Sequence, residues 1–265
     1  MDDLKHLQQV LLLIVKEIDA LCRRHGITYY LSGGTAIGAE RHGGFIPWDD
    51  DIDIMMPDAD YFRFLQICRE ELPSDRWYVQ EGLKDWPSGF SKLRLKGTYI
   101  EDAGEWSGIA RENRGIFIDI FRITNASLSP IGRRLQYFCD KMLISNSLRL
   151  KGYATDSMLK KVMLFASNLL RIKPINNLCE WVVYRYKDKK TGKVARFGNN
   201  VRFRGCFFDA DVFGTPVTRN FEGLELPVAA ENHKFLAQTY GDYMQMPPEC
   251  DRVIRHVLKV DFGRY

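Results

Sequence analysis

Apolar residues recur every three or four positions across residues 4–21, and polar residues fill the positions between them. This spacing predicts an amphipathic helix, and Gly26 is well placed to end it. The short apolar run at 27–31 then predicts a strand. The sequence SGGTAIGAERHGG, residues 32–44, predicts a tight turn that leads into a second helix.

Two short apolar runs that carry aspartate predict buried strands. The first is IDIMM at residues 52–56, which Pro57 ends, and the second is GIFIDIFRI at residues 115–123. Between them, residues 58–72 have helical spacing, and Asp58 is suited to cap the N-terminus of that helix.

The remaining pattern consists of one long helical region between two regions of short strands. Residues 90–101 alternate as a strand or hairpin does, residues 131–190 have helical periods with little glycine or proline, and residues 206–228 are typical of a hairpin. A final helix within residues 231–240 closes on Gly241. This order predicts a mixed sheet flanked by helices, in an α+β or α/β fold.

The composition is that of an ordinary globular protein, with 265 residues of which 45% are hydrophobic and 27% charged. None of the six cysteines forms a CxxC pair, so neither a zinc site nor a thiol–disulfide centre is indicated, and a reducing compartment fits. No stretch approaches the ~20 apolar residues of a membrane span, and the N-terminus lacks the pattern of a signal peptide. We therefore expect a cytoplasmic protein.

Charge divides the chain unevenly. Residues 130–197 contain 15 Lys and Arg against four Asp and Glu, a net charge of +11, whereas the remainder carries −7. Such a split is typical of a protein with a charged partner. We predict three parts: a core over residues 1–129, a basic helical module over 130–197, and a C-terminal cap over 198–265 that packs back on the core.

Three aspartates in the strand regions are the first candidates for chemistry. Residues two apart in a strand share a face and lie ~6.6 Å apart, so Asp51 and Asp53 point the same way. Asp119 sits among apolar residues, where a lone carboxylate is costly unless it is paired or binds a metal. If the two strands are neighbours, the three carboxylates converge and offer oxygen ligands to one or two Mg²⁺ or Mn²⁺ ions.

Other interpretations apply to parts of this acidic run. Asp49 and Asp50 follow Pro47 and are explained as turn residues that support the strand. An EF-hand loop that starts at Asp49 would place Ile54 where the turn glycine belongs, so that site is disfavoured.

The pair Gly33–Gly34 lies where a strand meets a helix. Backbone amides at such a helix start bind phosphate, and glycine lets the backbone approach closely. Taken alone, the pair fits an ordinary turn equally well. Asp51 follows Gly34 by 17 residues, enough for one helix and a return into the sheet. The turn and the carboxylates together therefore indicate metal-assisted phosphoryl chemistry.

The stretch SGGTAIGAERHGGFIPWDDDIDIMMP resembles the signature of the LicD family, which includes phosphorylcholine transferases and is related to fukutin-type transferases. The segments FSKLRLKGTYIE, RGIFIDIF, YGDYMQMPPECDR and VDFG are similar to that family too, so the resemblance covers nearly the whole chain. It implies the nucleotidyltransferase fold of the DNA polymerase beta superfamily, an α+β mixed sheet flanked by helices, here with an added basic helical module.

The resemblance also implies a reaction. A phospho-alcohol group, phosphocholine-like, would move from a CDP-activated donor to a sugar hydroxyl of a surface or capsular glycan, and CMP would leave. Asp51 and Asp53 would be metal ligands, and Asp119 a ligand and the general base. Many polymerase beta relatives have Gly-Gly/Ser where this chain has Ser-Gly-Gly. The resemblance therefore does not decide whether Ser32 contacts the phosphate. The donor phosphate would lie in a cradle formed by Ser32, Gly33, Gly34 and Thr35.

Several cationic or aromatic residues are secondary candidates, because charge develops on phosphoryl oxygens during transfer. Lys92 and Arg94 share a strand face that could equally be solvated, and Arg252 and His256 are four apart on an expected helix. Trp48 could stack on a base or pack the turn. The full set of secondary candidates is Arg41, His42, Trp48, Lys92, Arg94, Arg252 and His256.

Three other functions remain as alternatives. A nucleotidyltransferase would move NMP onto a small molecule and release pyrophosphate. A glycosyltransferase with a DxD motif is disfavoured, because that motif normally follows a longer nucleotide-binding βαβ region than this N-terminus allows. A membrane-associated scaffold with a degenerate site would bind no metal.

The basic helical module has two main interpretations. It could contact an anionic membrane surface from the inner face of the plasma membrane, which would suit a lipid-linked glycan acceptor. Its helices could instead pack on the core with a solvated basic face. Nucleic acid is not an expected partner, because no recognition motif supports it.

Overall fold

The computed structural model describes residues 2–102, 106–254 and 257–265. Within these residues, the central sheet has seven strands in the order β1, β2, β6, β4 and β3, with β7 pairing to the C-terminal end of β6 and to β8. β2 and β6 run parallel and the other pairs are antiparallel, so the α+β mixed sheet is confirmed. The bounds are β1 (Tyr30–Leu31), β2 (Asp53–Pro57), β3 (Trp77–Gln80), β4 (Ser91–Leu95), β6 (Ile116–Asn125), β7 (Lys193–Ala195) and β8 (Phe207–Asp209).

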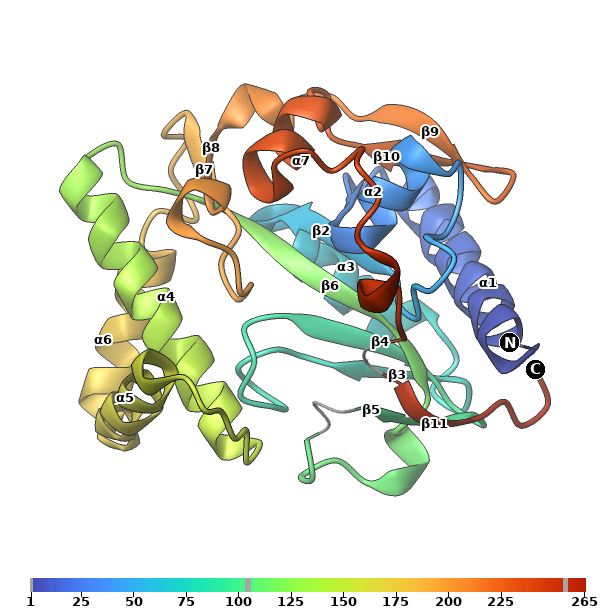
Figure 1. Cartoon of the computed structure of the whole chain (residues 1–265), viewed down its shortest axis with the longest axis horizontal. Coiled ribbons are helices and arrows are strands. Elements are labelled where there is room, and N and C mark those ends of the chain that lie inside the picture. Colours follow the sequence, from blue (N-terminus) through green and yellow to red (C-terminus); the bar gives the residue numbers. More distant parts are fainter. Residues whose placement is uncertain (1, 103–105, 255–256) are drawn as a thin grey trace.

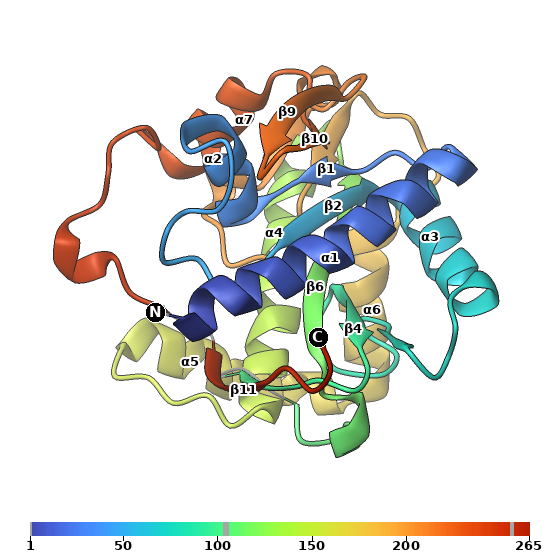
Figure 2. The same ribbon diagram turned by 90° about the vertical axis from the view of Figure 1, so that its right-hand side faces the viewer.

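Helix α1 (Asp2–His25) lies across the central sheet (Figure 2). Most of the positions that predicted it are buried in the main core, with Leu7, Leu11 and Ile14 at most 2% exposed, whereas Leu4 is only partly buried. Gly26 follows with φ at +61°, which ends the helix as expected. The predicted amphipathic helix is therefore confirmed, and its apolar face helps position β2 and β6.

The expected cap at Asp58 was wrong. Helix α3 (Asp58–Glu71) is preceded by Pro57 at the N-cap position, with no side-chain cap. The Asp58 carboxylate instead accepts hydrogen bonds from the Arg122 Nε at 2.7 Å and from the Thr124 hydroxyl at 3.1 Å. Because Asp58 comes directly after β2, its side chain reaches the neighbouring strand β6 and serves a tertiary ion pair there.

The hairpin alternative for residues 90–101 was also wrong. β4 lies between β3 and β6, whereas β5 (Tyr99–Asp102) pairs with β11 (Val257–Asp261) in a separate two-stranded sheet. Gly97, with φ at +81°, turns the chain between the two strands. The two strands therefore belong to different sheets.

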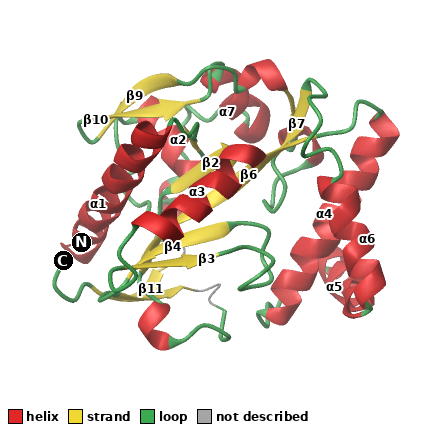
Figure 3. Ribbon diagram, turned by 180° about the vertical axis from the view of Figure 1, so that it is seen from behind, coloured by secondary structure: helices red, strands yellow, loops and turns green. Residues whose placement is uncertain are grey.

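The basic region folds into helices as its periodicity predicted (Figures 1 and 3). α4 (Pro130–Leu150), α5 (Met158–Ala166) and α6 (Lys173–Tyr184) lie to one side of the central sheet. None of the described helices combines the length and apolar character that a bilayer span requires. These helices enclose a second apolar cluster that includes Met142, Leu143, Leu170, Cys179 and Val183.

The C-terminal region packs back on the main core. β9 (Val217–Phe221) and β10 (Leu224–Val228) form the predicted hairpin. α7 (Asn232–Tyr240) ends at Gly241, whose φ is +78°. Phe221 and Phe235 are fully buried in the main core. The three-part division of the chain stays a prediction.

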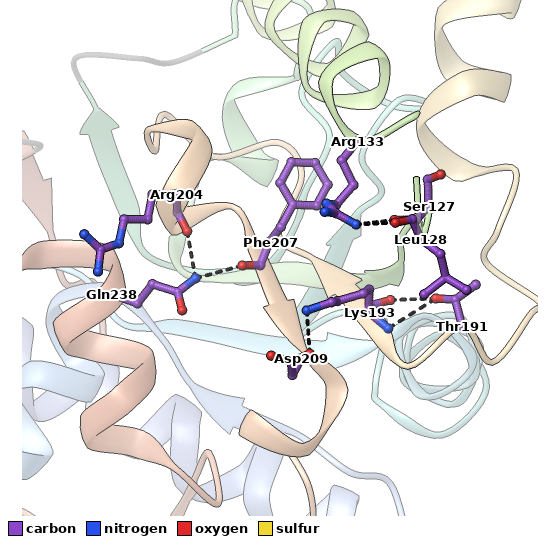
Figure 4. A network of polar contacts seen from close by, with 9 residues as sticks. All are labelled: Ser127, Leu128, Arg133, Thr191, Lys193, Arg204, Phe207, Asp209 and Gln238. Atoms are coloured by element: carbon purple, nitrogen blue, oxygen red, sulfur yellow. Dashed lines mark hydrogen bonds and ion pairs between the residues drawn. The ribbon is translucent and has the colours of Figure 1, made fainter. Parts of the chain in front are cut away.

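A polar network ties the helical module to the C-terminal region (Figure 4). The Lys193 ammonium of β7 lies 2.5 Å from the Asp209 carboxylate of β8, and it lowers the pKa of that carboxyl. Gln238 of α7 donates to the backbone carbonyls of Arg204 and Phe207 at 2.7 Å each. The network therefore fixes β7 and β8 beside α7.

Stability should depend on pH through Asp140 of α4. Burial raises the pKa of this carboxyl to about 6. A raised carboxyl pKa means that the folded state gains stability as pH falls, because it binds a proton before the unfolded chain does. Relative to Asp140→Asn, the wild type should gain about 1 kcal/mol between pH 7 and pH 5. Urea unfolding of both proteins at the two pH values measures the free energy of unfolding. If the difference between the two proteins were the same at pH 7 and pH 5, the prediction would be contradicted.

Candidate active site

Asp53 and Asp119 occupy paired positions on the two parallel strands. Asp53 begins β2 and lies in register with Asp119 of β6. Residues paired in this way project from the same face of neighbouring strands, which are ~4.8 Å apart. Ile52 and Ile54 are fully buried, while Asp51 and Asp53 are partly exposed, so the expected alternation holds.

The electrostatics place two more carboxylates in the same group. The pKa of Asp53 is raised well above its usual range, first by burial and then by the negative charges of Asp51, Asp119 and Asp49. Asp49, Asp50 and Asp51 also each present a carboxylate oxygen within 4.8 Å of the others. The structure thus brings the three predicted aspartates together and adds Asp49, which the sequence assigned to the turn.

This donor set fits a divalent cation. Hard ions such as Mg²⁺ and Mn²⁺ take carboxylate oxygens, and their charge would offset the repulsion that raises the pKa of Asp53. Asp50 has a different task, since its buried Oδ2 accepts a hydrogen bond from the backbone N–H of Val257 at 2.8 Å. That bond agrees with the supporting role expected for Asp50.

The glycine turn is shaped around the carboxylates. Helix α2 (Gly33–Arg41) starts directly after β1. A Cβ at Gly33, where φ is +56°, would overlap the Asp53 carboxylate, and one at Gly34 would overlap the carboxylate of Asp49. Glycine is therefore required here because two acidic side chains lie against the backbone. The first turn of α2 and the acidic cluster form one site.

The hydroxyl groups beside the glycines are used within the protein. Ser32 and Thr35 are at most 1% exposed. The Thr35 hydroxyl accepts a hydrogen bond from the backbone N–H of Asp53 at 2.9 Å, and the Ser32 hydroxyl accepts one from Arg196 at 2.8 Å. Both hydroxyls therefore make hydrogen bonds within the protein, and they link β2 and Arg196 to the first turn of α2.

Arg196, which follows β7, was not among the candidates predicted from the sequence. The residue is 1% exposed, its guanidinium lies 4.7 Å from the Phe235 ring centroid, and its positive charge opposes the raised pKa of Asp53. The surrounding sequence VARFG gave one signal, an arginine among apolar residues at a strand end. Its contact with Ser32 spans 164 residues, which no local pattern reveals.

Lys92 and Arg94 share a face of β4, as predicted, but that face is buried and not solvated. The Lys92 ammonium lies 2.9 Å from Asp119 and 3.2 Å from the Phe117 ring centroid. Arg94 donates to the side chain of Gln80 at 2.8 Å and to the carbonyl of Gly115. Lys92 therefore lies beside the acidic cluster, whereas the bonds of Arg94 to Gln80 and Gly115 connect β4 to the neighbouring strand β3 and to the start of β6.

Arg41 and His42 lie at the end of α2. Arg41 donates to the backbone carbonyls of Tyr243 and Gln245, which ties the C-terminal segment to this helix. His42 is exposed at the surface, and partial loss of solvent around its ring, together with the charge of Arg41, lowers its pKa. The described contacts of Arg41 are therefore structural.

The helix expected around Arg252 was wrong. Arg252 follows the short 3-10 helix η5 (Glu249–Asp251), and its Nε donates to the carbonyl of Pro247 at 2.9 Å. Its guanidinium lies 5.7 Å from the ring centroid of the half-buried Trp48. Pro247 and Pro248 come directly before η5, which is only three residues long. His256 lies outside the described residues.

Comparison with known proteins agrees with this arrangement. Residues 26–127 match the family described as "LicD/FKTN/FKRP, nucleotidyltransferase domain". The lipopolysaccharide cholinephosphotransferase LicD of Haemophilus influenzae is 29% identical over 265 residues, which cover 96% of each chain. The ribitol 5-phosphate transferase FKRP of Homo sapiens is 55% identical over 29 residues, which are 11% of this chain and 6% of that protein. Residues 26–127 are thus similar to the nucleotidyltransferase domain of LicD/FKTN/FKRP proteins.

Proposed function

We propose that this protein is a metal-dependent transferase that moves a phospho-alcohol group, phosphocholine-like, from a CDP-activated donor to a sugar hydroxyl of a surface or capsular glycan. The observation that carries the proposal is the group of carboxylates around Asp53, in register with Asp119 and packed against the glycine turn. The names of the two related transferases, one for cholinephosphate and one for ribitol 5-phosphate, support a phospho-alcohol group as cargo.

The reaction follows from the proposed placement of the donor. The acceptor oxygen forms a bond to the distal phosphorus while the bond from that phosphorus to the bridging oxygen breaks, so that CMP leaves and a phosphodiester remains. Asp119 takes the proton of the acceptor hydroxyl. The amides of Gly33 and Gly34 bind and orient the donor phosphate. Bound Mg²⁺ or Mn²⁺, held by Asp51, Asp53 and Asp119, supplies charge neutralisation at the diphosphate.

The donor sets the proposed location. A CDP-activated alcohol is a cytoplasmic metabolite, so the reaction belongs in the cytoplasm. Where the acceptor is a lipid-linked glycan, the enzyme works peripherally on the inner face of the plasma membrane. The head group remains one of four candidates: choline, ethanolamine, glycerol or ribitol.

Product analysis tests the proposal. The protein is incubated with a panel of the four CDP-alcohols, Mg²⁺ or Mn²⁺ and a glycan acceptor, and nucleotide release is followed. We expect CMP from at least one donor, with loss of release in EDTA and recovery when metal is added back. Absence of CMP from every donor in the presence of acceptor would refute the proposal.

The family description favours one second candidate, a nucleotidyltransferase. Such an enzyme would move NMP to a small molecule and release pyrophosphate. A second incubation, with CTP and a phospho-alcohol, separates the two activities. Release of pyrophosphate there identifies the second candidate, whereas release of CMP in the incubation with a CDP-alcohol identifies the first.

Arg196 should contribute to transfer through its positive charge beside Asp53 and Ser32. We expect Arg196→Gln to lower kcat/KM by roughly 100-fold, the scale of removing one electrostatic contact in a buried site, with partial recovery in Arg196→Lys. Lys193→Gln, three residues earlier and paired with the remote Asp209, is the matched control and should stay near wild type. If Arg196→Gln were as active as Lys193→Gln, the proposed contribution of Arg196 to transfer would be wrong.

A further inference from the structure

Helix α5 exposes its apolar side chains instead of burying them. Among its nine residues, all described, none is buried. Met158, Leu159, Val162 and Phe165 are 73%, 74%, 58% and 79% exposed. Their spacing of one, three and three residues places them along one side of the helix. A helix with this composition normally turns such a side toward a protein core.

The exposed apolar stripe continues past the end of α5. The following 3-10 helix η2 (Ser167–Arg171) carries Leu169, which is 53% exposed, and Ile172 comes next at 51%. Leu170 instead turns inward to the second apolar cluster. We call the six outward side chains the α5 surface: Met158, Leu159, Val162, Phe165, Leu169 and Ile172.

The charge around the α5 surface has one sign. Residues 157–179 contain four cationic residues and no Asp or Glu. All four are exposed, and they lie between or directly beside members of the apolar stripe. The four are Lys160, Lys161, Arg171 and Lys173.

We propose that the α5 surface docks on an anionic lipid bilayer. Large exposed apolar patches mark interaction sites, and an apolar stripe bordered by Lys and Arg is the pattern of helices that lie in the membrane interface. A second copy of the chain is a less suitable partner. If two α5 surfaces met, the four cations of one would face the four cations of the other, and residues 157–179 contain no carboxylate to offset the repulsion. The sequence allowed membrane contact somewhere in residues 130–197, and we now place this proposed contact at residues 158–172.

The position of α5 suits this task. It packs against α4 and η2 at the outer end of the helical module, away from the central sheet (Figures 1 and 3). Apolar side chains there can enter the headgroup region while the lysines and arginines meet lipid phosphates. The inference does not rest on the proposed transferase activity, although both would apply to a lipid-linked acceptor.

Vesicle sedimentation with the full-length protein tests the proposal. We expect binding to vesicles of 70% phosphatidylcholine and 30% phosphatidylglycerol, weaker binding in 0.5 M salt, and little binding to phosphatidylcholine alone. The double variant Leu159→Ser/Phe165→Ser should bind at least 10-fold more weakly. Its folding should be intact by circular dichroism, because both side chains already lie mostly in solvent.

Leu258→Ser is the matched control, since Leu258 is 68% exposed on β11, outside the α5 surface. It should bind vesicles like the wild type. Equal binding by the double variant, or no preference for anionic vesicles, would overturn the proposal. So would a dimer in solution that the double variant abolishes, which would assign the surface to a second copy. CMP release with a soluble acceptor should be the same in all three proteins, so failure of docking and failure of the transferase proposal are separate results.

Discussion

Replacing Asp53 with asparagine should lower transfer activity by roughly 10³-fold or more and at the same time make the metal-free protein more stable. Activity falls because a metal-binding carboxylate is lost from the centre of the cluster. Stability rises because burial and the charges of Asp51, Asp119 and Asp49 oppose ionisation of Asp53 in the folded protein. A loss of activity together with a gain in stability is the result expected of a functional cluster, because replacing a structural carboxylate would lower stability.

Two measurements check this expectation for Asp53→Asn. Single-turnover release of CMP reports activity, and thermal unfolding in EDTA reports stability, with an increase in Tm as the expected direction. Mg²⁺ should raise the Tm of the wild type and much less that of the variant, because only the wild type retains the complete ligand set.

Asp209→Asn is the control for Asp53→Asn, since Asp209 is exposed and pairs with Lys193 outside the site. It should change neither activity nor the response to Mg²⁺. A variant Asp53→Asn that loses stability in EDTA, or that keeps a tenth of wild-type activity, would contradict the role given to Asp53.

Replacing Gly33 with alanine should remove most of the activity, whereas the same change at Gly26 should leave it. Both glycines have positive φ, +56° and +61°, so both variants carry backbone strain of about 1 kcal/mol. At Gly26 the added Cβ meets nothing within 4 Å, but at Gly33 it overlaps the Asp53 carboxylate. Gly33→Ala must therefore displace the Asp53 carboxylate, which is a proposed metal ligand.

Urea unfolding and CMP release together separate strain from displacement. We expect similar losses of stability in Gly26→Ala and Gly33→Ala from strain, and a loss of activity of roughly 100-fold or more in Gly33→Ala alone, since small displacements of catalytic groups are costly. If Gly33→Ala were as active as Gly26→Ala, the close packing of the turn on Asp53 would not matter to catalysis.

The predictions that held are those that depend on neighbours within a few residues. Alternation predicted that Asp51 and Asp53 point one way and Ile52 and Ile54 the other, and the two aspartates are partly exposed while the two isoleucines are buried. Helical spacing identified α1 for the same kind of reason, and Gly241 ended α7 where expected. The family resemblance drawn from SGGT and PWDDDID also held.

The predictions that failed are those in which a side chain contacts a segment that is distant in the sequence. Asp58 had the sequence position of a helix cap, but Arg122 of β6 lies beside it. The sequence leaves Lys92 and Arg94 open between a site role and a solvated face, because a strand pattern does not say which neighbours cover it, and only the structure shows that both are buried. The helix expected from the spacing of Arg252 and His256 was also wrong, since Arg252 follows a short 3-10 helix.

The sequence by itself determined which residues are the candidates for the chemistry, because the types and local spacing of Gly33, Gly34, Asp51 and Asp53 already limit what they can bind. Only the tertiary structure decided how they meet. The parallel register of β2 with β6 brings Asp119 to Asp53, and β7 carries Arg196 to Ser32 across 164 residues. The physical reason is that local geometry follows from backbone sterics within a few residues, whereas strand register and burial depend on packing of the whole chain.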